Sequence, residues 1–419
     1  MRALGMLFGL VCPGIALGGF NDFDLEPASY YDRAYTDPMT KVIAAQQGDF
    51  GTERGKGLLV RLLEELEVPV ESQVMVFTKT SLQRGVVWPE NPRAMYFNEE
   101  VYVGWAPGGR IEVGSVDPKV GMIFTIENEA GEGDREKTVK FESHRQCIQC
   151  HAGSATNFIP GPLARSVHPD SQGRVRGTVR SFDLVSHKVP VDERWGGWWV
   201  TGAGKKFPHR GNRTVGNGTR EISSRGAPVL EDLSGILDDA EQFPVVGSNV
   251  ATLMVFDHQL GVHQQITESH YKVRYEAWAV DEENDWETKI PEEAMEVAEE
   301  EKEKLVKMLL MVDEATFPGD QVTVDEGYLK AFREGRKEDS EGRSLKDFAI
   351  GDDRLFKWRC SYMIYSGAFQ GLPGVFKQMV YARLAEVLGA EQPVEGYEHL
   401  SRGERAVILG ILRETILEF

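Results

Sequence analysis

Apolar and polar positions alternate in short runs through residues 72–143, which is the pattern of β-strands. These runs are rich in β-branched and aromatic residues, and turn sequences such as PENP, APGG and DPKVG separate them. The expected strands are SQVMVFTK (72–79), EEVYVGW (99–105), RIEVGSVD (110–117), GMIFTIEN (121–128) and KTVKFES (137–143). The segments GRVRGTVRSFDLV (173–185) and GGWWVTG (196–202) have the same character. The pattern predicts a mostly antiparallel sheet.

Helical periodicity appears before this region and again after it. KGLLVRLLEEL (56–66) places its leucines on one stripe. From residue 248 the chain has few helix breakers, and the segments beginning at 291, 360 and 401 have apolar stripes, the last with a capping box in SRGE. We therefore expect an α+β fold: a sheet-containing domain over residues 19–245 and a mostly helical domain over 246–419 that packs on it.

Residues 1–18 are expected to be an export signal. Met1 and Arg2 precede an apolar stretch that is too short to cross a bilayer comfortably and that ends in small residues. Removal of this segment also removes Cys12. A lipid anchor at Cys12 is the alternative, although the preceding FGLV lacks the usual small residue. No later run reaches the ~20 apolar residues of a membrane-spanning helix, so we expect a periplasmic or secreted protein.

The charge balance narrows the choice of partners. The 419 residues contain 47 Lys and Arg against 66 Asp and Glu, which gives a net charge of −19. Binding to nucleic acid or to an anionic membrane through bulk charge is therefore disfavoured. Any protein partner is expected to have a basic surface.

One short motif carries the strongest chemical signal. Cys147 and Cys150 are followed directly by His151 in CIQCH. C-x-x-C alone would indicate a disulfide or a redox dithiol in an oxidising compartment. With the histidine it becomes the pattern of c-type haem attachment, in which both thiols add to the haem vinyl groups and the imidazole ligates iron. We expect one covalent haem c, held in a loop against the sheet and not in a small all-helical cytochrome fold.

The second axial ligand of the iron has several candidates. His144, His168, His187 and His399 lie in polar or turn-like contexts and are expected at the surface. In RWGGWWVTGAGKKFPHRGN (194–212), Trp195, Trp198 and His209 could close over the haem, with the cations Lys205, Lys206, Arg210 and Arg213 meeting its propionates. The alternative is that these tryptophans are ordinary core residues.

Two further histidines lie on the long predicted helix. His258 and His263 are five residues apart, about 140° around a helix, so the two cannot face one metal ion as an i, i+4 pair does. One of them could reach the iron, and Met254 is a possible thioether ligand. Cys360 is expected to be an inert buried thiol.

Almost the whole expected mature chain resembles a family of secreted bacterial proteins with a single C-x-x-C-H haem. The resemblance rests on NPRAMYFNEEVYVGW, CIQCH, ERWGGWWVTG with the downstream HRGN, MVFDHQLGVH and CSYMIYSGAF. More widely the chain resembles c-type cytochromes, which implies haem binding and electron transfer through Cys147, Cys150 and His151. Histidines recur in the family at the positions of His209, His258 and His263. AGKK after VTG departs from the more usual THG of that block.

Two functions follow from these observations. The first is an extracytoplasmic monohaem cytochrome that transfers single electrons. The alternative is a haem enzyme, peroxidase-like or oxygenase-like, with an open sixth iron position and a nearby histidine as acid or base. A redox or gas sensor would require a signalling output, and nothing in the carboxyl-terminal helices resembles one.

Overall fold

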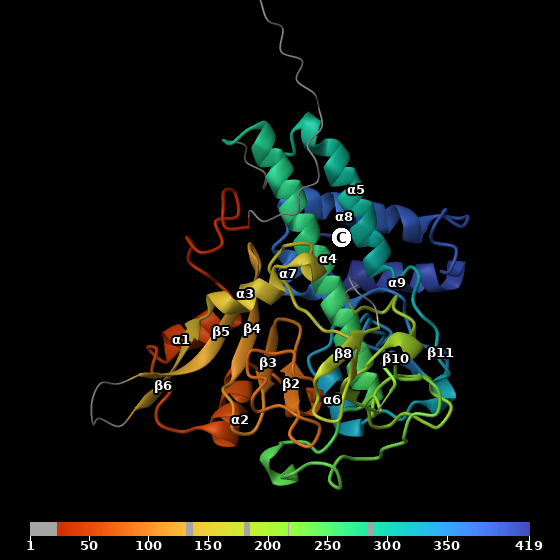
Figure 1. The fold of residues 1–419 in the computed structure, drawn as a ribbon. Helices are drawn as coiled ribbons and strands as arrows, with labels where there is room; N and C mark the ends of the chain where they lie inside the picture. The colour runs from red at the N-terminus through yellow and green to blue at the C-terminus, as the bar shows by residue number, and fades with distance from the viewer. Residues whose placement is uncertain (1–22, 131–136, 180–184, 217, 284–287) are drawn as a thin grey trace, which may run out of the picture.

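The computed structural model describes residues 23–130, 137–179, 185–216, 218–283 and 288–419. It has the predicted α+β architecture, with a seven-stranded sheet in the amino-terminal half and most of its helices in the other half (Figure 1). Neighbouring strands are antiparallel in the order β6-β5-β4-β3-β2-β1-β9. The strands are β1 (Val74–Val76), β2 (Arg93–Phe97), β3 (Val101–Trp105), β4 (Glu112–Asp117), β5 (Gly121–Ala130), β6 (Thr138–Ser143) and β9 (Trp198–Trp199).

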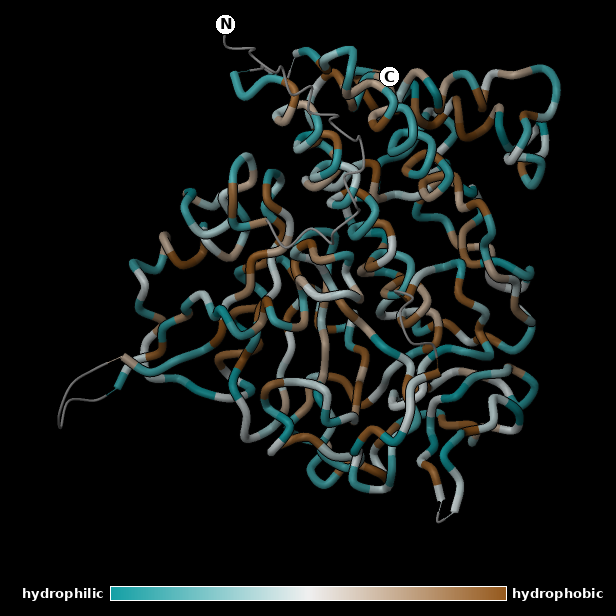
Figure 2. Tube along the Cα trace, turned by 45° about the horizontal axis from the view of Figure 1, so that its top comes forward, coloured by the Kyte–Doolittle hydropathy of each residue, from teal (hydrophilic) through white to brown (hydrophobic). Residues whose placement is uncertain are grey.

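One face of the sheet is covered by two short amino-terminal helices. α1 (Pro38–Ala45) and α2 (Gly55–Glu65) pack on it, and the predicted leucine stripe of 56–66 is confirmed because Leu58, Leu59, Leu62 and Leu63 are buried. These leucines form one core with alternate residues of the strands. In Figure 2 the brown, apolar stretches lie mostly inside the molecule and the teal, hydrophilic stretches mostly at its periphery.

The opposite face of the sheet packs against the carboxyl-terminal half. Its long central helix α4 (Val250–Val280) begins at Asn249, whose side chain accepts a hydrogen bond from the Ala251 amide at 2.9 Å. One continuous core contains sheet residues together with residues of α4 and the later helices. The two halves therefore share a core, and the boundary at 245/246 stays a prediction.

The remaining elements are short. The other α-helices are α3 (Arg145–His151), α5 (Met295–Leu309), α6 (Glu326–Arg333), α7 (Gly367–Gln370), α8 (Gly374–Gly389) and α9 (Arg402–Thr415). The 3₁₀ turns are η1 (Val70–Ser72), η2 (Ser154–Thr156), η3 (Val191–Glu193), η4 (Ala240–Gln242), η5 (Glu292–Ala294), η6 (Gly319–Gln321) and η7 (Tyr362–Tyr365). Two separate hairpins are β7 (Val167–Pro169) with β8 (Val175–Thr178), and β10 (Phe348–Ile350) with β11 (Asp353–Phe356). The predicted cap of the last helix is confirmed, since Ser401 Oγ accepts from the Glu404 amide.

Several expectations need correction. CIQCH lies on the helix α3 and not in a loop, because residues 145–151 contain no breaker. The expected strand over 173–185 shortens to β8, and its residues 180–184 lie outside the described residues. His168 and His187, expected at the surface, are buried, whereas His144 and His399 are partly exposed. Within the described residues, no helix is both long and apolar enough to cross a membrane.

Candidate functional site at helix α3

Helix α3 places the two thiols one turn apart on the same side. Cys147 is half-buried against the main core, Cys150 is exposed, and both are free thiols. Burial, followed by the nearby Glu112 carboxylate, raises the pKa of Cys147 to about 11. Reactive dithiols need a lowered thiol pKa, so this environment does not favour a redox dithiol.

His151 is held in one tautomer by a carbonyl group. Its Nδ1 lies 3.0 Å from the Gly161 carbonyl oxygen. A carbonyl only accepts hydrogen bonds, so Nδ1 carries the proton and the neutral ring keeps a lone pair on Nε2. Burial lowers the pKa of His151 to about 4, and the imidazole is therefore neutral at pH 7. A ring with one N–H fixed by a carbonyl and the other nitrogen free is the usual arrangement of a metal-binding histidine.

The His151 ring rests on strand β5. Its centroid lies 4.4 Å from that of Phe124. Phe124 pairs across the sheet with Gly114, which pairs in turn with Tyr102, so these three residues share one face. The Met122 sulfur fills the space over Gly114, where an added Cβ would lie 2.8 Å from it. The Met122 thioether thus lies on the same face of the sheet as Phe124. The spacing of residues in the sequence did not predict this position of Met122.

An ion pair lies near the motif. Arg93 on β2 and Glu112 on β4 form an ion pair, with 21% and 13% of their side chains exposed. Arg93 acts on the pKa of both Cys147 and His151, and Arg165 acts on that of His151. Neither arginine was among the cations predicted to meet the haem propionates.

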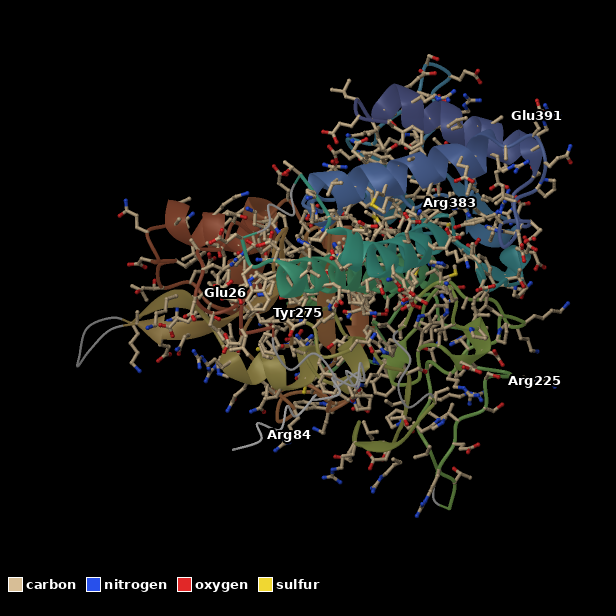
Figure 3. All side chains as sticks on the ribbon, turned by 90° about the horizontal axis from the view of Figure 1, so that it is seen from above. Glu26, Arg84, Arg225, Tyr275, Arg383 and Glu391 are labelled. Atoms are coloured by element: carbon tan, nitrogen blue, oxygen red, sulfur yellow. The ribbon has the colours of Figure 1, made fainter. Side chains whose placement is uncertain are left out.

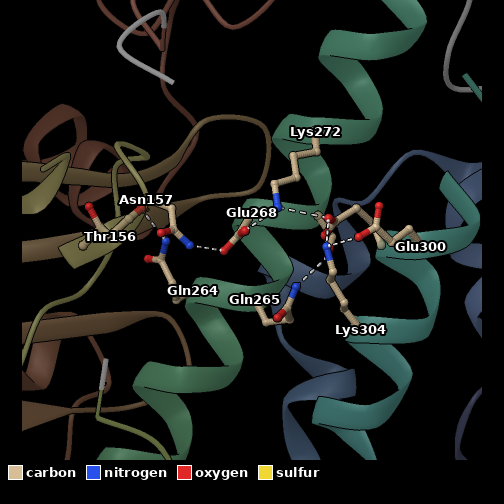
Figure 4. A network of polar contacts seen from close by, with 10 residues as sticks. Thr156, Asn157, Gln264, Gln265, Glu268, Lys272, Glu300 and Lys304 are labelled. Carbon is tan, nitrogen blue, oxygen red and sulfur yellow. Dashed lines mark hydrogen bonds and ion pairs between the residues drawn. The ribbon is translucent and has the colours of Figure 1, made fainter. Parts of the chain in front are cut away.

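The turn after the motif is fastened to α4, as Figure 4 shows. Gln264 donates from Nε2 to the Thr156 carbonyl at 2.8 Å, and Asn157 donates to Glu268 at the same distance. Glu268 is paired with Lys272, which also reaches Glu301 on α5. Helix α3 is therefore positioned by contacts with residues more than 100 positions away in the chain.

The tryptophans of 194–212 bind protein groups through their indole N–H. Trp195 donates to Asp257 Oδ2 and Trp198 to the Arg165 carbonyl, each at 2.9 Å. Both rings are buried in the main core. These contacts agree with the interpretation of both tryptophans as core residues. Trp198 is nevertheless bonded to the backbone of Arg165, whose side chain acts on the pKa of His151.

The basic part of that block lies elsewhere. His209 is buried and its Nδ1 accepts from the Gly211 amide at 3.1 Å. Arg210 donates to the Ile222 carbonyl, Arg213 donates to the Ser223 and Gly226 carbonyls, and Lys205 and Lys206 are exposed. Figure 3 shows Arg225, a further cation beyond this block in the chain, at the edge of the molecule. The structure does not bring these cations to the motif.

The two histidines of α4 lie in different surroundings, as their spacing predicts. His258 contacts His187 (Nδ1 to Nδ1, 3.0 Å) and Ser361 (Nε2 to Oγ, 2.8 Å). His263 Nδ1 lies 2.7 Å from the Tyr102 hydroxyl oxygen, within hydrogen-bond distance. Burial lowers the pKa of both histidines to about 3.

The remaining predicted candidates lie in the interior. Met254 is in the main core, and burial raises the pKa of the Cys360 thiol to about 12, as expected of an inert cysteine. The described residues include no group of three or more His, Cys, Asp or Glu that could hold a metal ion without a prosthetic group.

Comparison with models of protein families finds no match to this chain, and none is found among curated proteins or solved structures.

Proposed function

We propose that this chain is a monohaem c-type cytochrome that transfers single electrons outside the cytoplasm. In this proposal Cys147 and Cys150 form thioethers with the two haem vinyl groups, and His151 is an axial ligand of the iron. The observation that carries it is the His151 Nδ1 contact with the Gly161 carbonyl, because it leaves Nε2 as the only free lone pair of the ring.

The surrounding residues suit this role. Burial keeps His151 neutral, and Phe124 supports the ring and excludes water from one side. Arg165 provides positive charge for a haem carboxylate, whereas the charge of Arg93 is balanced by its ion pair with Glu112. The haem, when bound, supplies the one-electron chemistry, and its burial and axial ligands set the potential.

The second axial ligand in this proposal is His209, His258 or His263. Each imidazole is buried and neutral near pH 7, because burial lowers its pKa to about 4, 3 and 3, respectively. Ligation by any of them requires its ring to leave a present contact or to use the opposite nitrogen.

An open sixth position is the second candidate, and it makes the protein a haem enzyme of the peroxidase or oxygenase class. The observation that favours it is that His258 uses both ring nitrogens in contacts, while His209 and His263 each use Nδ1. An iron with a vacant face binds small molecules.

The expected signal over residues 1–18 supports export to the periplasm or beyond. The net charge of −19 supports a redox partner with a basic surface.

Spectra of the reduced protein with and without carbon monoxide test these proposals. We expect a low-spin spectrum that carbon monoxide leaves unchanged, and we expect one of three single variants, His209→Gln, His258→Gln or His263→Gln, to become high-spin and bind carbon monoxide. His399→Gln, at a partly exposed histidine, is the control. Carbon monoxide binding by the unaltered protein would contradict the electron carrier and support the enzyme.

A further inference from the structure

A surface cavity of about 770 Å³ lies between the β7–β8 hairpin and the loop that carries Val215 and Arg220. The hairpin contributes its turn after Asp170 and the beginning of β8, and no residue of the CIQCH motif lines the cavity. Its volume is in the range of sites for small organic molecules.

The hairpin side of the cavity is fixed by the surrounding fold. Asp170 closes the turn, because its Oδ1 accepts hydrogen bonds from the Gln172 and Arg174 amides, each at 2.9 Å. Gly173 has φ +74°, and an added Cβ there would clash with the Phe77 carbonyl oxygen. The turn therefore packs directly on the chain that follows β1.

The loop on the other side is bonded to β7 at two points. The Val215 amide donates to the Pro169 carbonyl at 2.7 Å, and the Ile222 amide donates to His168 Nδ1 at 3.0 Å. His168 is 6% exposed, so the second bond is shielded from water. Together these bonds hold Arg220 beside the hairpin.

Three guanidinium groups line the cavity, those of Arg174, Arg176 and Arg220. Arg176 is paired with Asp170 at 2.7 Å, and since Asp170 is the only carboxylate among the described lining residues, these two charges balance. The side chains of Arg174 and Arg220 are exposed and form neither an ion pair nor a hydrogen bond within the described part of the chain. An entering anion would thus meet two accessible positive charges.

This positive charge is concentrated in one segment of an acidic protein. Residues 161–230 contain 12 Lys and Arg against five Asp and Glu, whereas the whole chain has a net charge of −19. The excess of negative charge therefore lies outside this segment. Because a cluster of one sign of charge raises the local concentration of its counter-ions, the cavity favours anionic ligands.

We propose that this cavity binds a phosphate dianion, either free or as the monoester of a small molecule, between the guanidinium groups of Arg174 and Arg220. The planar guanidinium fork matches phosphate oxygens and can bind two of them at once. A phosphate monoester carries about −1.5 to −2 charge near pH 7, which balances two guanidinium groups.

Two further residues of the cavity suit such a ligand. The exposed Ser171 hydroxyl can donate a hydrogen bond to a phosphate oxygen. Val175 is 39% exposed and offers apolar surface to the organic part of an ester. The site goes beyond the haem proposal, because it uses none of the residues assigned to the haem.

Isothermal titration calorimetry on the exported, purified full chain tests this site at about 0.15 M ionic strength, where attraction between distant surface charges is screened. Phenyl phosphate should bind at one site, about fivefold or more tighter than phenyl sulfate, which has a similar shape but a single negative charge. No binding of phenyl phosphate, or equal affinity for phenyl sulfate, would overturn the proposal.

Inorganic phosphate, titrated in the same way, distinguishes the two sources of the phosphate group. Binding at least as tight as that of phenyl phosphate assigns the site to free phosphate. Weaker binding assigns it to a phosphate monoester, whose organic part then contributes contacts of its own.

Single variants test the two arginines. Arg174→Gln and Arg220→Gln each remove one charge from an exposed side chain and should weaken binding of phenyl phosphate about tenfold. Arg84→Gln, at an exposed arginine outside the cavity (Figure 3), is the matched control and should leave the affinity unchanged. Unchanged affinity in either cavity variant, or an equal loss in the control, would overturn the proposal.

Two further measurements on the same samples separate the possible causes of a failure. Near-ultraviolet circular dichroism shows whether each variant is folded. The haem absorbance is read independently of the titrations, so failure of the phosphate site is distinguishable from failure of the haem proposal.

Discussion

Helices α3 and α4 both carry histidines that the sequence marks as candidate iron ligands, and they present them differently. α3 is seven residues long, has thiols at half-buried and exposed positions, and leaves Nε2 of His151 without a hydrogen-bond partner in the described part of the chain. α4 is 31 residues long and is buried around most of its circumference, and His258 and His263 are tied to residues from distant segments. The residues proposed to attach haem are thus neighbours in the chain, whereas the α4 histidines belong to a polar network of the core.

The largest expected effect concerns the α3 side of this comparison. Replacing Cys147 and Cys150 by Ala should abolish covalent haem, because no thiol of the motif remains to add to a vinyl group. The measurement is the haem absorbance left on the protein after acid-acetone extraction. Cys360→Ala, at a buried cysteine, is the control and should retain the full haem content.

The second largest expected effect is on the stability of the polar network around α4. Arg194 and Asp257 form an ion pair at 3.4 Å, each with 3% of the side chain exposed. Arg194→Met leaves the carboxyl group buried without its cation and should lower the free energy of unfolding by about 3–5 kcal/mol. Urea denaturation measures this, and Lys137→Met, in an exposed pair, should cost no more than about 1 kcal/mol. Equal losses in the two variants would contradict a structural role for the α4 network.

Acidification should destabilise the folded chain through its buried histidines. Burial lowers the pKa of His209 to about 4 and of His258, His263 and His270 to about 3, and it places that of His187 well below its usual value. The unfolded chain takes up protons at these histidines near pH 6.5 while the folded chain does not, so their contribution to stability is lost as pH falls from about 6.5 towards 4.

Three carboxyl groups have the opposite effect on the free energy of unfolding as the pH falls. Burial raises the pKa of Glu100, Asp257 and Glu314 to about 7, so the folded state holds protons there that the unfolded state releases. The five histidines outnumber them, and the free energy of unfolding measured in urea should fall between pH 6.5 and 4. A flat or rising profile would contradict the neutral burial of the histidines. His258→Gln should reduce the slope.

The smallest effect links the two helices. Gln264→Leu removes the donor to the Thr156 carbonyl and should lower stability by about 1 kcal/mol. Because this bond holds the turn that follows His151, we also expect a shift of the haem reduction potential in voltammetry. Gln265→Leu, whose amide donates to Ser269 on the same helix, is the matched control and should leave the potential unchanged. A shift of the same size in both variants would contradict positioning of α3 by Gln264.

Local patterns predicted the elements that depend on neighbouring residues. Alternation over residues 72–143 located β1, β3, β4, β5 and β6, and helical periodicity located α2 and α4. Strand β2 was not predicted, because Pro92 and the PENP turn directly before it read as loop. Its pairing with β1 and β3 stabilises this strand, although its local sequence does not predict one.

Local sequence patterns could not predict the surroundings of the candidate site. Gly161 is ten residues from His151 and Phe124 is on another element, so no fixed spacing connects them with the motif. The burial of His187 arises from its contact with His258, 71 residues later in the chain. This contact involves His187 Nδ1 alone, since Nε2 has no hydrogen-bond partner among the described residues.

The most direct test of the central claim is a visible spectrum of the protein purified from a haem-attaching, exporting host, recorded before and after acid-acetone extraction. We expect a Soret band that remains with the polypeptide and disappears in the Cys147→Ala, Cys150→Ala double variant. A protein without a Soret band, or one whose haem is extracted, would contradict covalent attachment at helix α3.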